Sequence, residues 1–298
     1  MTESLAARVA AALDARVMDE VRAFAAKLGE AAGALGVLFY GSNLRTGSLE
    51  GVLDFYVLLP GPVERGIWPR VSYHEWDTGP QTLRAKVATM TLATFHAAAA
   101  GETLDTTIWA RFVQPSALAW LPESGDASAI REAVAQAAVT AARLAAALGP
   151  DEATAEDYWR GLFRATYAAE FRVEKAGRED SILSANRDHF AGLLPLALEA
   201  AGIPFEPRGE RLAIALPPAQ RAKTLAWWRK RRRLGKPYNL IRLVRASTTF
   251  EGAGRYAAWK IERHTGVPVK LTPWRERHPV LAAPGVLWQV WRARRKQA

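Results

Sequence analysis

The first segment of the chain places apolar and charged residues with the period of a helix. Between residues 5 and 28 an apolar residue recurs every three or four positions, and charged residues lie between them. The recurring residues are Leu5, Val9, Leu13, Val17, Val21, Phe24 and Leu28. This period predicts an amphipathic helix that ends near Gly29.

Short apolar runs bounded by glycine and proline follow this segment. Residues 36–42 form a run that stops at Gly41-Ser42, and residues 52–59 form a second run that prolines close. Both runs contain mostly strand-forming residues, which predicts two strands joined by a loop. Residues 81–91 and 106–114 alternate apolar and polar positions, so we expect further strands of the same sheet there.

Alanine-rich helical patterns occupy the middle of the chain. Residues 128–148 and 155–174 predict two long helices, with Ser128 and Thr154 as their N-terminal caps. Residues 189–201 predict a third helix, which ends at a glycine and a proline.

These patterns divide the chain into three parts. Strands give way to helices near residue 150, which predicts a sheet-containing domain at 1–150 and a helical domain at 151–218. A small strand is expected at 211–216, and residues 219–298 form a basic, tryptophan-rich C-terminal region. The expected fold class is α/β, a mixed sheet followed by a mostly helical, basic C-terminal part.

The formal net charge of +10 is unevenly distributed. From residue 220 to the end there are 20 Lys and Arg against three acids, whereas the first 219 residues hold 20 basic and 27 acidic groups. This asymmetry predicts a polyanionic partner: nucleic acid, an anionic membrane surface or a polyanionic small substrate. The absence of cysteine excludes disulfides, thiolate nucleophiles and iron–sulfur clusters.

Several other functional classes find no support in the sequence. No run of about 18 uncharged apolar residues occurs, and charged residues interrupt the N-terminal segment, so we expect neither a membrane span nor a signal peptide. The five histidines show no metal-ligand spacing. P-loop and dinucleotide-binding fingerprints are absent, which argues against kinases and dehydrogenases.

The most informative segment joins the first two expected strands. The first strand ends in Gly41-Ser42, and after eleven further residues Asp54 lies inside the second strand, a layout typical of the nucleotidyltransferase superfamily. Glycine lets the backbone approach a triphosphate, the serine hydroxyl and loop amides bind its oxygens, and the strand presents a carboxylate to Mg²⁺. The same residues would also fit a plain turn and a strand-edge acid. Tyr56 stands where most of the superfamily has a second carboxylate.

Longer blocks of the sequence resemble a narrower family, the mitochondrial-type phosphatidate cytidylyltransferases, also called the translocator assembly and maintenance family. Like that family, the chain has Tyr40-Gly41-Ser42 followed by a strand with the single Asp54. The segment around Lys86 looks like the family's lysine-bearing strand, and the segment from Arg111 to Pro115 looks like its Arg-x-x-x-Pro block.

Three further blocks continue the resemblance as far as Lys260. Residues 162–179 are similar to a family helix that ends in Gly-Asp-Phe-Arg and Gly-Glu, with Ala169-Glu170 in place of Gly-Asp. Residues 244–248 and 255–260 look like the family's Val-Arg-x-Ser-Ser and Arg-Tyr blocks.

The resemblance implies a nucleotidyltransferase-type sheet and a Mg²⁺-dependent reaction of CTP with phosphatidate that gives CDP-diacylglycerol and pyrophosphate. Asp54 and Glu170 would hold the metal, with Glu179 as the alternative second acid. The implied site residues are Asp54, Lys86 and Arg111 for catalysis, Tyr40, Gly41, Ser42 and Arg172 for the nucleotide, and Arg245, Arg255, Lys260, Trp288 and Trp291 for the acceptor or the membrane. The enzyme would be cytoplasmic and peripheral on the inner face of the membrane.

Two tryptophan pairs precede cationic runs in the basic region. Trp227-Trp228 precedes residues 229–236, and Trp288 and Trp291 precede residues 292–296. Tryptophan beside Lys and Arg suits an anionic lipid surface, and it also suits nucleic acid, where rings stack on bases. A solvated helix with its tryptophans in the core is the simplest alternative. We favour the membrane over nucleic acid because the implied acceptor stays in the bilayer.

Two other functions remain open at this point. The chain could transfer a nucleotide to another acceptor, namely tRNA, a protein or a small molecule. It could also be a non-catalytic basic protein that binds nucleic acid or lipid through a degenerate nucleotidyltransferase fold. The presence of Ser42, Asp54, Lys86 and Arg111 favours an enzyme.

Overall fold

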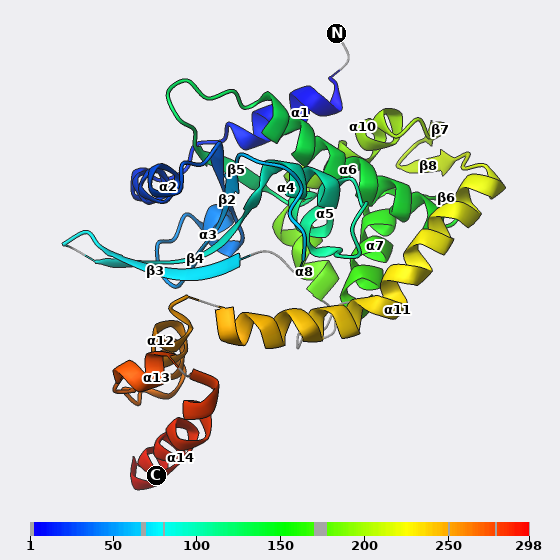
Figure 1. Cartoon of the computed structure of the whole chain (residues 1–298). Coiled ribbons are helices and arrows are strands. Elements are labelled where there is room, and N and C mark those ends of the chain that lie inside the picture. Colours follow the sequence, from blue (N-terminus) through cyan, green and yellow to red (C-terminus); the bar gives the residue numbers. More distant parts are fainter. Residues whose placement is uncertain are drawn as a thin grey trace.

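A five-stranded mixed sheet forms one side of the molecule, with strand order β3-β4-β2-β1-β5 (Figure 1). The structure is a computed structural model that describes residues 3–66, 70–79, 81–169, 178–249, 251–277 and 279–297. The strands are β1 (Gly36–Tyr40), β2 (Leu53–Leu59), β3 (Arg70–Asp77), β4 (Thr82–Thr91) and β5 (Ser116–Trp120). The β2–β4 pair is parallel and the other neighbouring pairs are antiparallel. The expected mixed sheet is confirmed.

The two faces of this sheet pack against different layers. Phe55 of β2 is buried on the face that α2 (Asp19–Ala32) covers, whereas Tyr56 is buried against the helices of the opposite face. Because side chains alternate along a strand, Asp54 lies on the same face as Tyr56. The parallel register places Asp54 directly beside Lys86 of β4 on that face.

The N-terminal segment forms two helices, so the single helix predicted at 5–28 is wrong. α1 spans Leu5–Leu13, and α2 follows after a break and ends at Ala32. Val9 of α1 is buried in the helical layer, whereas Phe24 of α2 is buried against the sheet. One straight helix could not fill both cores, and the chain therefore turns between the two segments.

The strand predicted at 106–114 is also wrong, because this segment forms α5 (Thr107–Phe112). Its residues Ile108, Trp109 and Phe112 are buried. Phe112 follows Ile108 by four positions and Trp109 by three, and residues with these spacings lie on one face of a helix. Because the segment is short and mostly apolar, its sequence fits the period of a strand as well as that of a helix.

The helical layer is built around α6 (Ser128–Leu148), against which α4 (Leu92–Ala99), α5 and α1 pack. The remaining helices of this layer are α7 (Ala155–Ala169), α8 (Arg178–Ala185), α9 (Arg187–Phe190) and α10 (Leu193–Ala200). A small antiparallel sheet at its edge has the order β6-β8-β7. Its strands are β6 (Glu152–Thr154), β7 (Phe205–Arg208) and β8 (Arg211–Ile214).

Most predictions for this layer, the Thr154 cap among them, are confirmed, with two changes. The helix predicted at 189–201 is divided at Gly192, which has a positive φ of 72°. Thr154 caps α7 by accepting a hydrogen bond from the amide of Asp157. Ser128 does not cap α6, because the carboxylate of Asp126 accepts the amide of Ser128 instead. Residues 170–174 of the predicted second helix lie outside the described residues.

One hydrophobic core runs across the boundary predicted near residue 150. It joins residues of α1 and α6 to Trp159 of α7 and to Trp228 of α11 (Pro218–Thr249). α11 crosses the end of α7 at Gly235, where a Cβ atom would lie 2.5 Å from the carbonyl oxygen of Ala169. Glycine therefore permits this close approach of two backbones.

The C-terminal helices project from the body of the molecule (Figure 1). They are α12 (Ala253–Thr265), α13 (Pro273–Arg277) and α14 (Pro279–Gln297). α12 packs against β3, and the amide of Tyr73 donates a hydrogen bond of 2.8 Å to the carbonyl of Glu251 just before that helix. The expected helical C-terminal part is confirmed. Within the described residues, no helix is both long enough and apolar enough to cross a bilayer.

Candidate functional site

The turn that follows β1 brings the backbone against Asp54. Gly41 has a φ of 96°, and a Cβ atom there would lie 3.4 Å from Oδ2 of Asp54. Only glycine adopts this conformation without strain. The chain then enters the short helix α3 (Ser42–Thr46), which leaves Ser42 exposed, and Asn43 fixes the loop by donating to the carbonyls of Ser48 and Glu50. The predicted Gly-Ser turn therefore borders the predicted carboxylate.

Asp54 is a desolvated carboxylate. Burial raises its pKa, and the nearby charges of Lys86 and Arg111 oppose that rise. No described residue donates a hydrogen bond to its oxygens. A buried carboxylate that lacks protein donors is available to a cation or to a cation-bound substrate.

Lys86 lies at the centre of a positively charged cluster. Burial lowers its pKa most, Asp54 raises it, and the charges of Arg111, Lys260 and Arg242 lower it further. Lys86 makes no hydrogen bond with a described residue. Repulsion among cations that share a site destabilises the protein unless an anion is bound between them.

Arg111 is fixed in this cluster by aromatic residues. Its Nη1 donates a hydrogen bond of 2.7 Å to the hydroxyl of Tyr56, and its guanidinium lies 5.1 Å from the ring centre of Tyr40. Burial raises the pKa of Tyr56, which keeps the phenol neutral. Tyr56, two positions after Asp54, thus positions an arginine.

Arg242 is a member of the cluster that the sequence did not indicate. It comes from α11, and its Nη1 lies 3.0 Å from Oδ1 of Asp105. Asp105 is buried in the loop before α5 and also accepts hydrogen bonds from the amide and hydroxyl of Thr107. The sequence separation of 137 residues left no local pattern from which this pair could be predicted.

α12 supplies Lys260, whose charge acts on Lys86. Tyr256 packs against Tyr73 of β3 with ring centres 5.4 Å apart, and Lys260 lies over the Tyr256 ring at 5.6 Å. These contacts hold the first half of α12 next to the sheet. Arg255 points elsewhere and forms an ion pair of 3.1 Å with Glu276 of α13.

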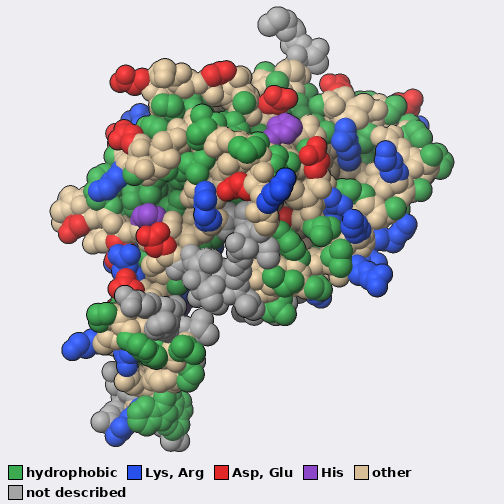
Figure 2. Space-filling view, viewed as in Figure 1, with side chains coloured by type: hydrophobic (Ala, Val, Ile, Leu, Met, Phe, Trp, Pro, Cys, Tyr) green, Lys and Arg blue, Asp and Glu red, His purple; other side chains and the backbone are tan. Residues whose placement is uncertain are grey.

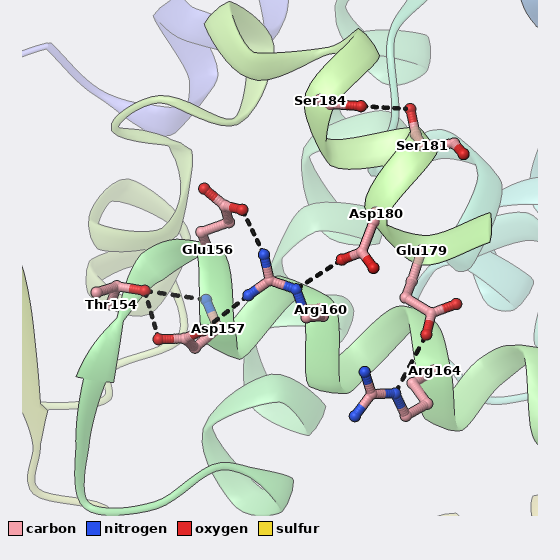
Figure 3. A network of polar contacts seen from close by, with 9 residues as sticks. All are labelled: Thr154, Glu156, Asp157, Arg160, Arg164, Glu179, Asp180, Ser181 and Ser184. Carbon is pink, nitrogen blue, oxygen red and sulfur yellow. Dashed lines mark hydrogen bonds and ion pairs between the residues drawn. The ribbon is translucent and has the colours of Figure 1, made fainter. Parts of the chain in front are cut away.

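The other implied residues do not join this cluster in the described part of the chain. Glu170 and Arg172 lie outside the described residues, as does the side chain of Arg245, so their roles stay predictions. Glu179 of α8 forms an ion pair of 3.2 Å with Arg164 of α7 (Figure 3). In the same figure Arg160 pairs with Glu156 and Asp157 of its own helix and with Asp180 of α8, so Asp180 and Glu179 tie α8 to α7. The alternative assignment of Glu179 to a metal gains no support.

The site fits Mg²⁺ only as an ion that arrives with a substrate. Among the described residues, no three His, Cys, Asp or Glu side chains come together to hold a metal. Mg²⁺ is, however, commonly bound by one or two carboxylates together with substrate phosphates and water. Asp54, which has no hydrogen-bond donor among the described residues, matches that role.

The two tryptophan pairs have different environments. Trp228 is 2% exposed, and Trp227 packs beside it against Trp109, so the first pair belongs to the core. Trp288 and Trp291 of α14 are 56% and 53% exposed. Only the second pair is available for a surface contact.

α14 has one buried and one exposed apolar face. Ala282, Val286 and Val290 are buried on the side where α14 packs against α12 and α13. Leu281 is 69% exposed, and with Trp288 and Trp291 it leaves apolar surface open to solvent. Figure 2 shows apolar side chains gathered over these projecting helices and cations along the edge formed by α11.

The comparisons with known proteins leave the family open. Neither a scan against models of known protein families nor a search of curated proteins gave a match. The function is therefore inferred from the geometry of the site and from the motifs in the sequence.

Proposed function

We propose that this protein is a CTP:phosphatidate cytidylyltransferase that works at an anionic membrane surface. The observation that carries the proposal is the arrangement around Asp54. A carboxylate that accepts no hydrogen bond from a described residue borders a positive-φ glycine turn, the charges of Lys86 and Arg111 act on this carboxylate, and those of Arg242 and Lys260 act on Lys86. Such a site suits two phosphorylated reactants and a divalent ion. The choice of CTP and phosphatidate comes from the sequence resemblance.

The proposed chemistry needs charge stabilisation more than acid–base catalysis. An oxygen of the phosphatidate phosphate attacks the α-phosphorus of CTP, the bond between the α- and β-phosphates breaks, and pyrophosphate leaves. Lys86 and Arg111 would stabilise the charge that develops on the transferring group. Gly41 leaves space for the triphosphate, and the exposed hydroxyl of Ser42 donates to its oxygens. Asp54 would hold Mg²⁺ together with the phosphates, and the chemistry that this ion would supply is charge neutralisation at the leaving pyrophosphate.

The exposed face of α14 supports the membrane part of the proposal. Tryptophans at headgroup depth beside arginines are typical of proteins that bind anionic bilayers peripherally. Arg292 lies over the ring of Trp288 at 5.3 Å, so a cation accompanies one of the exposed rings. Attachment to the inner face of a cytoplasmic membrane is part of the same proposal.

A transfer assay tests the proposed function. Labelled CTP and Mg²⁺ are incubated with phosphatidate, and label in CDP-diacylglycerol is measured beside a panel with tRNA and other acceptors. Asp54→Asn removes the metal-binding charge, and loss of one preorganised electrostatic contact lowers turnover by about 100-fold or more. Asp151→Asn is the control, because Asp151 is an exposed carboxylate that pairs with Arg221.

The assay also separates the alternatives. Transfer to tRNA or another acceptor with none to phosphatidate would favour the second enzymatic function. Absence of transfer to every acceptor would favour a non-catalytic protein. Undiminished transfer by Asp54→Asn would show that Asp54 is not the metal ligand.

A further inference from the structure

The cations of the site come from four different elements of the fold, β4, α5, α11 and α12. The pKa of Asp54 is lowered by the charges of Lys86 and Arg111, whereas the pKa of Lys86 is lowered by Arg242 and Lys260 as well as by Arg111. Arg242 and Lys260 are therefore close enough to Lys86 for their charges to act on it. Arg242 comes from α11 and Lys260 from α12, and both lie near a sheet whose strands come much earlier in the chain.

Arg242 is held by a deeply buried carboxylate. The side chain of Asp105 is 1% exposed, and its oxygens accept hydrogen bonds of 2.8 to 3.0 Å from Thr107 as well as from Arg242. A charge-assisted bond to an aspartate fixed in this way determines where the guanidinium lies. Asp105 therefore anchors Arg242 at the border between α11 and the loop before α5.

The other edge of this guanidinium is available to a ligand. All hydrogen bonds from Arg242 start at Nη1, and they reach Asp105 and, at 3.5 Å, Thr107 and Asn239. Its Nε and Nη2 make no hydrogen bond with the part of the chain that the structure describes. These two nitrogens form the edge of arginine that binds two oxygens of one phosphate. The side chain is 19% exposed, so part of it is in contact with solvent.

We propose that Arg242 binds the phosphate monoester of the acceptor and that Asp105 is its positioning residue. The identity of the acceptor rests on the proposed function, in which two phosphates meet at Lys86. The triphosphate occupies the side of Gly41 and Asp54, and the acceptor phosphate occupies the side of Arg242 and Lys260.

This placement brings the two reactants of the transfer step together. The acceptor enters as a dianion, so one of its oxygens forms the new bond to the α-phosphorus without loss of a proton. The bond between the α-phosphorus and the bridging oxygen breaks, and pyrophosphate takes the electron pair. Arg242 holds the attacking phosphate while Arg111 and Lys86 face the transferring group.

Direct binding to the full-length protein tests this inference. Calorimetry with soluble dihexanoyl phosphatidate and with glycerol 3-phosphate measures recognition of the phosphate with and without acyl chains. Arg242→Ala should weaken both by about 10- to 100-fold, which is the range expected for loss of a charged hydrogen-bonded contact. Mg-CTP affinity should stay unchanged. Arg242→Lys should bind with intermediate affinity because it keeps the charge and loses the two-oxygen edge.

Asp105→Asn tests the positioning role. It should raise the KM for phosphatidate and leave the KM for CTP unchanged, a split that general loosening of the fold would not produce. Arg221→Ala is the matched control, because Arg221 is another α11 arginine that pairs with an aspartate, Asp151, at 2.7 Å. Thermal unfolding of each variant establishes that it folds.

The outcomes distinguish this inference from the proposed function. Three results would each overturn the inference: unchanged phosphate affinity in Arg242→Ala, an equal loss of phosphate affinity in Arg221→Ala, or no phosphate binding by the wild-type protein. Phosphate binding that depends on Arg242, without cytidylyl transfer by the wild-type protein, would support the phosphate site and reject the proposed reaction.

Discussion

Burial decides the chemical state of individual residues in this protein. Asp54 and Lys86 are partly withdrawn from water, and burial is the largest influence on the pKa of each. Both shifts disfavour the charged form, while their mutual attraction favours it. The site therefore lowers the stability of the folded protein in the absence of ligand. Residues kept in such a state are expected where a substrate supplies the missing charge.

The first prediction is that Asp54→Asn raises the free energy of unfolding in metal-free buffer at neutral pH. The folded-state pKa of Asp54 is above the unfolded value, so ionisation at neutral pH favours the unfolded state, and the variant removes that penalty. Urea unfolding at pH 7 and at pH 5 checks this. The gain should shrink as the pH falls toward the ordinary carboxyl range. A variant that is less stable than the wild type at pH 7 would contradict the argument.

His189 gives a second prediction at this scale. Its Nε2–H donates a hydrogen bond of 2.9 Å to the Val113 carbonyl, and burial lowers its pKa, with that bond opposing the shift and Arg8 adding to it. A lowered histidine pKa means that stability is lost as the pH falls below about 6.5, because the unfolded state binds the proton first. His189→Gln should flatten the dependence of unfolding free energy between pH 8 and 5. An unchanged slope would rule out this assignment.

At the scale of elements, α11 holds the loop between α4 and α5 at two points. Arg242 pairs with Asp105 near the end of that loop. Arg231 is 5% exposed and donates to the carbonyls of Gly101, Thr103 and Trp227, with its guanidinium 4.0 Å from the Trp227 ring centre. Because α5 carries Arg111, these contacts connect the position of α11 to the site.

The third prediction concerns Arg231. Arg231→Met should lower the free energy of unfolding by about 3 kcal/mol, because it leaves buried carbonyl groups without donors. Arg229→Met is the control on an exposed position of the same helix, and its effect should stay within about 0.5 kcal/mol. Denaturant unfolding measures both. Equal effects of the two substitutions would show that the buried contacts do not stabilise the fold.

The fourth prediction concerns the turn between β1 and α3. Gly41→Ala should lower stability by about 1 to 3 kcal/mol, because alanine is strained at a φ of 96°. It should also weaken Mg-CTP binding, since the new methyl group lies beside Asp54. Gly161→Ala in α7 is the control: its Cβ meets nothing within 4 Å, and the helix should gain about 0.5 to 1 kcal/mol. Normal CTP affinity in Gly41→Ala would contradict the proposed nucleotide position.

At the scale of the whole molecule, charge and apolar surface gather at the C-terminal end. The last 79 residues hold 20 basic and three acidic groups, a net charge of +17, whereas the first 219 residues have a net charge of −7. α14 exposes Leu281, Trp288 and Trp291 on a unit that projects from the body (Figure 1). Exposed apolar patches bordered by charges mark surfaces that bind partners or membranes.

The fifth prediction is that this surface binds anionic bilayers. Trp288→Ala combined with Trp291→Ala should reduce co-sedimentation with phosphatidate-containing liposomes, and binding by the wild type should fall with added salt. Turnover of short-chain soluble phosphatidate should survive in the same variant. Val63→Ala, at a 55% exposed position on the body, is the control. Tight RNA binding without preference for liposomes would favour the nucleic-acid alternative.

The sequence was a good guide where a pattern depends on neighbouring residues. The first two strands and the alanine-rich α6 agree with prediction within one or two residues, because alternation and helical period reflect burial on one face. It was a poor guide at α5, where a short apolar segment fits either period. The break between α1 and α2 was also missed, since it depends on which layer each half covers.

The sequence by itself determined the mixed α/β character, the glycine–serine turn before a strand that carries Asp54, and the basic C-terminal region. Only the tertiary structure decided that Tyr56 holds Arg111, that Asp105 holds Arg242, and that Lys260 comes beside Lys86. The physical reason is the sequence separation of the interacting residues. Strands and turns follow from the steric and burial preferences of neighbouring residues, whereas the cluster of charges from β4, α5, α11 and α12 forms only when distant elements pack together.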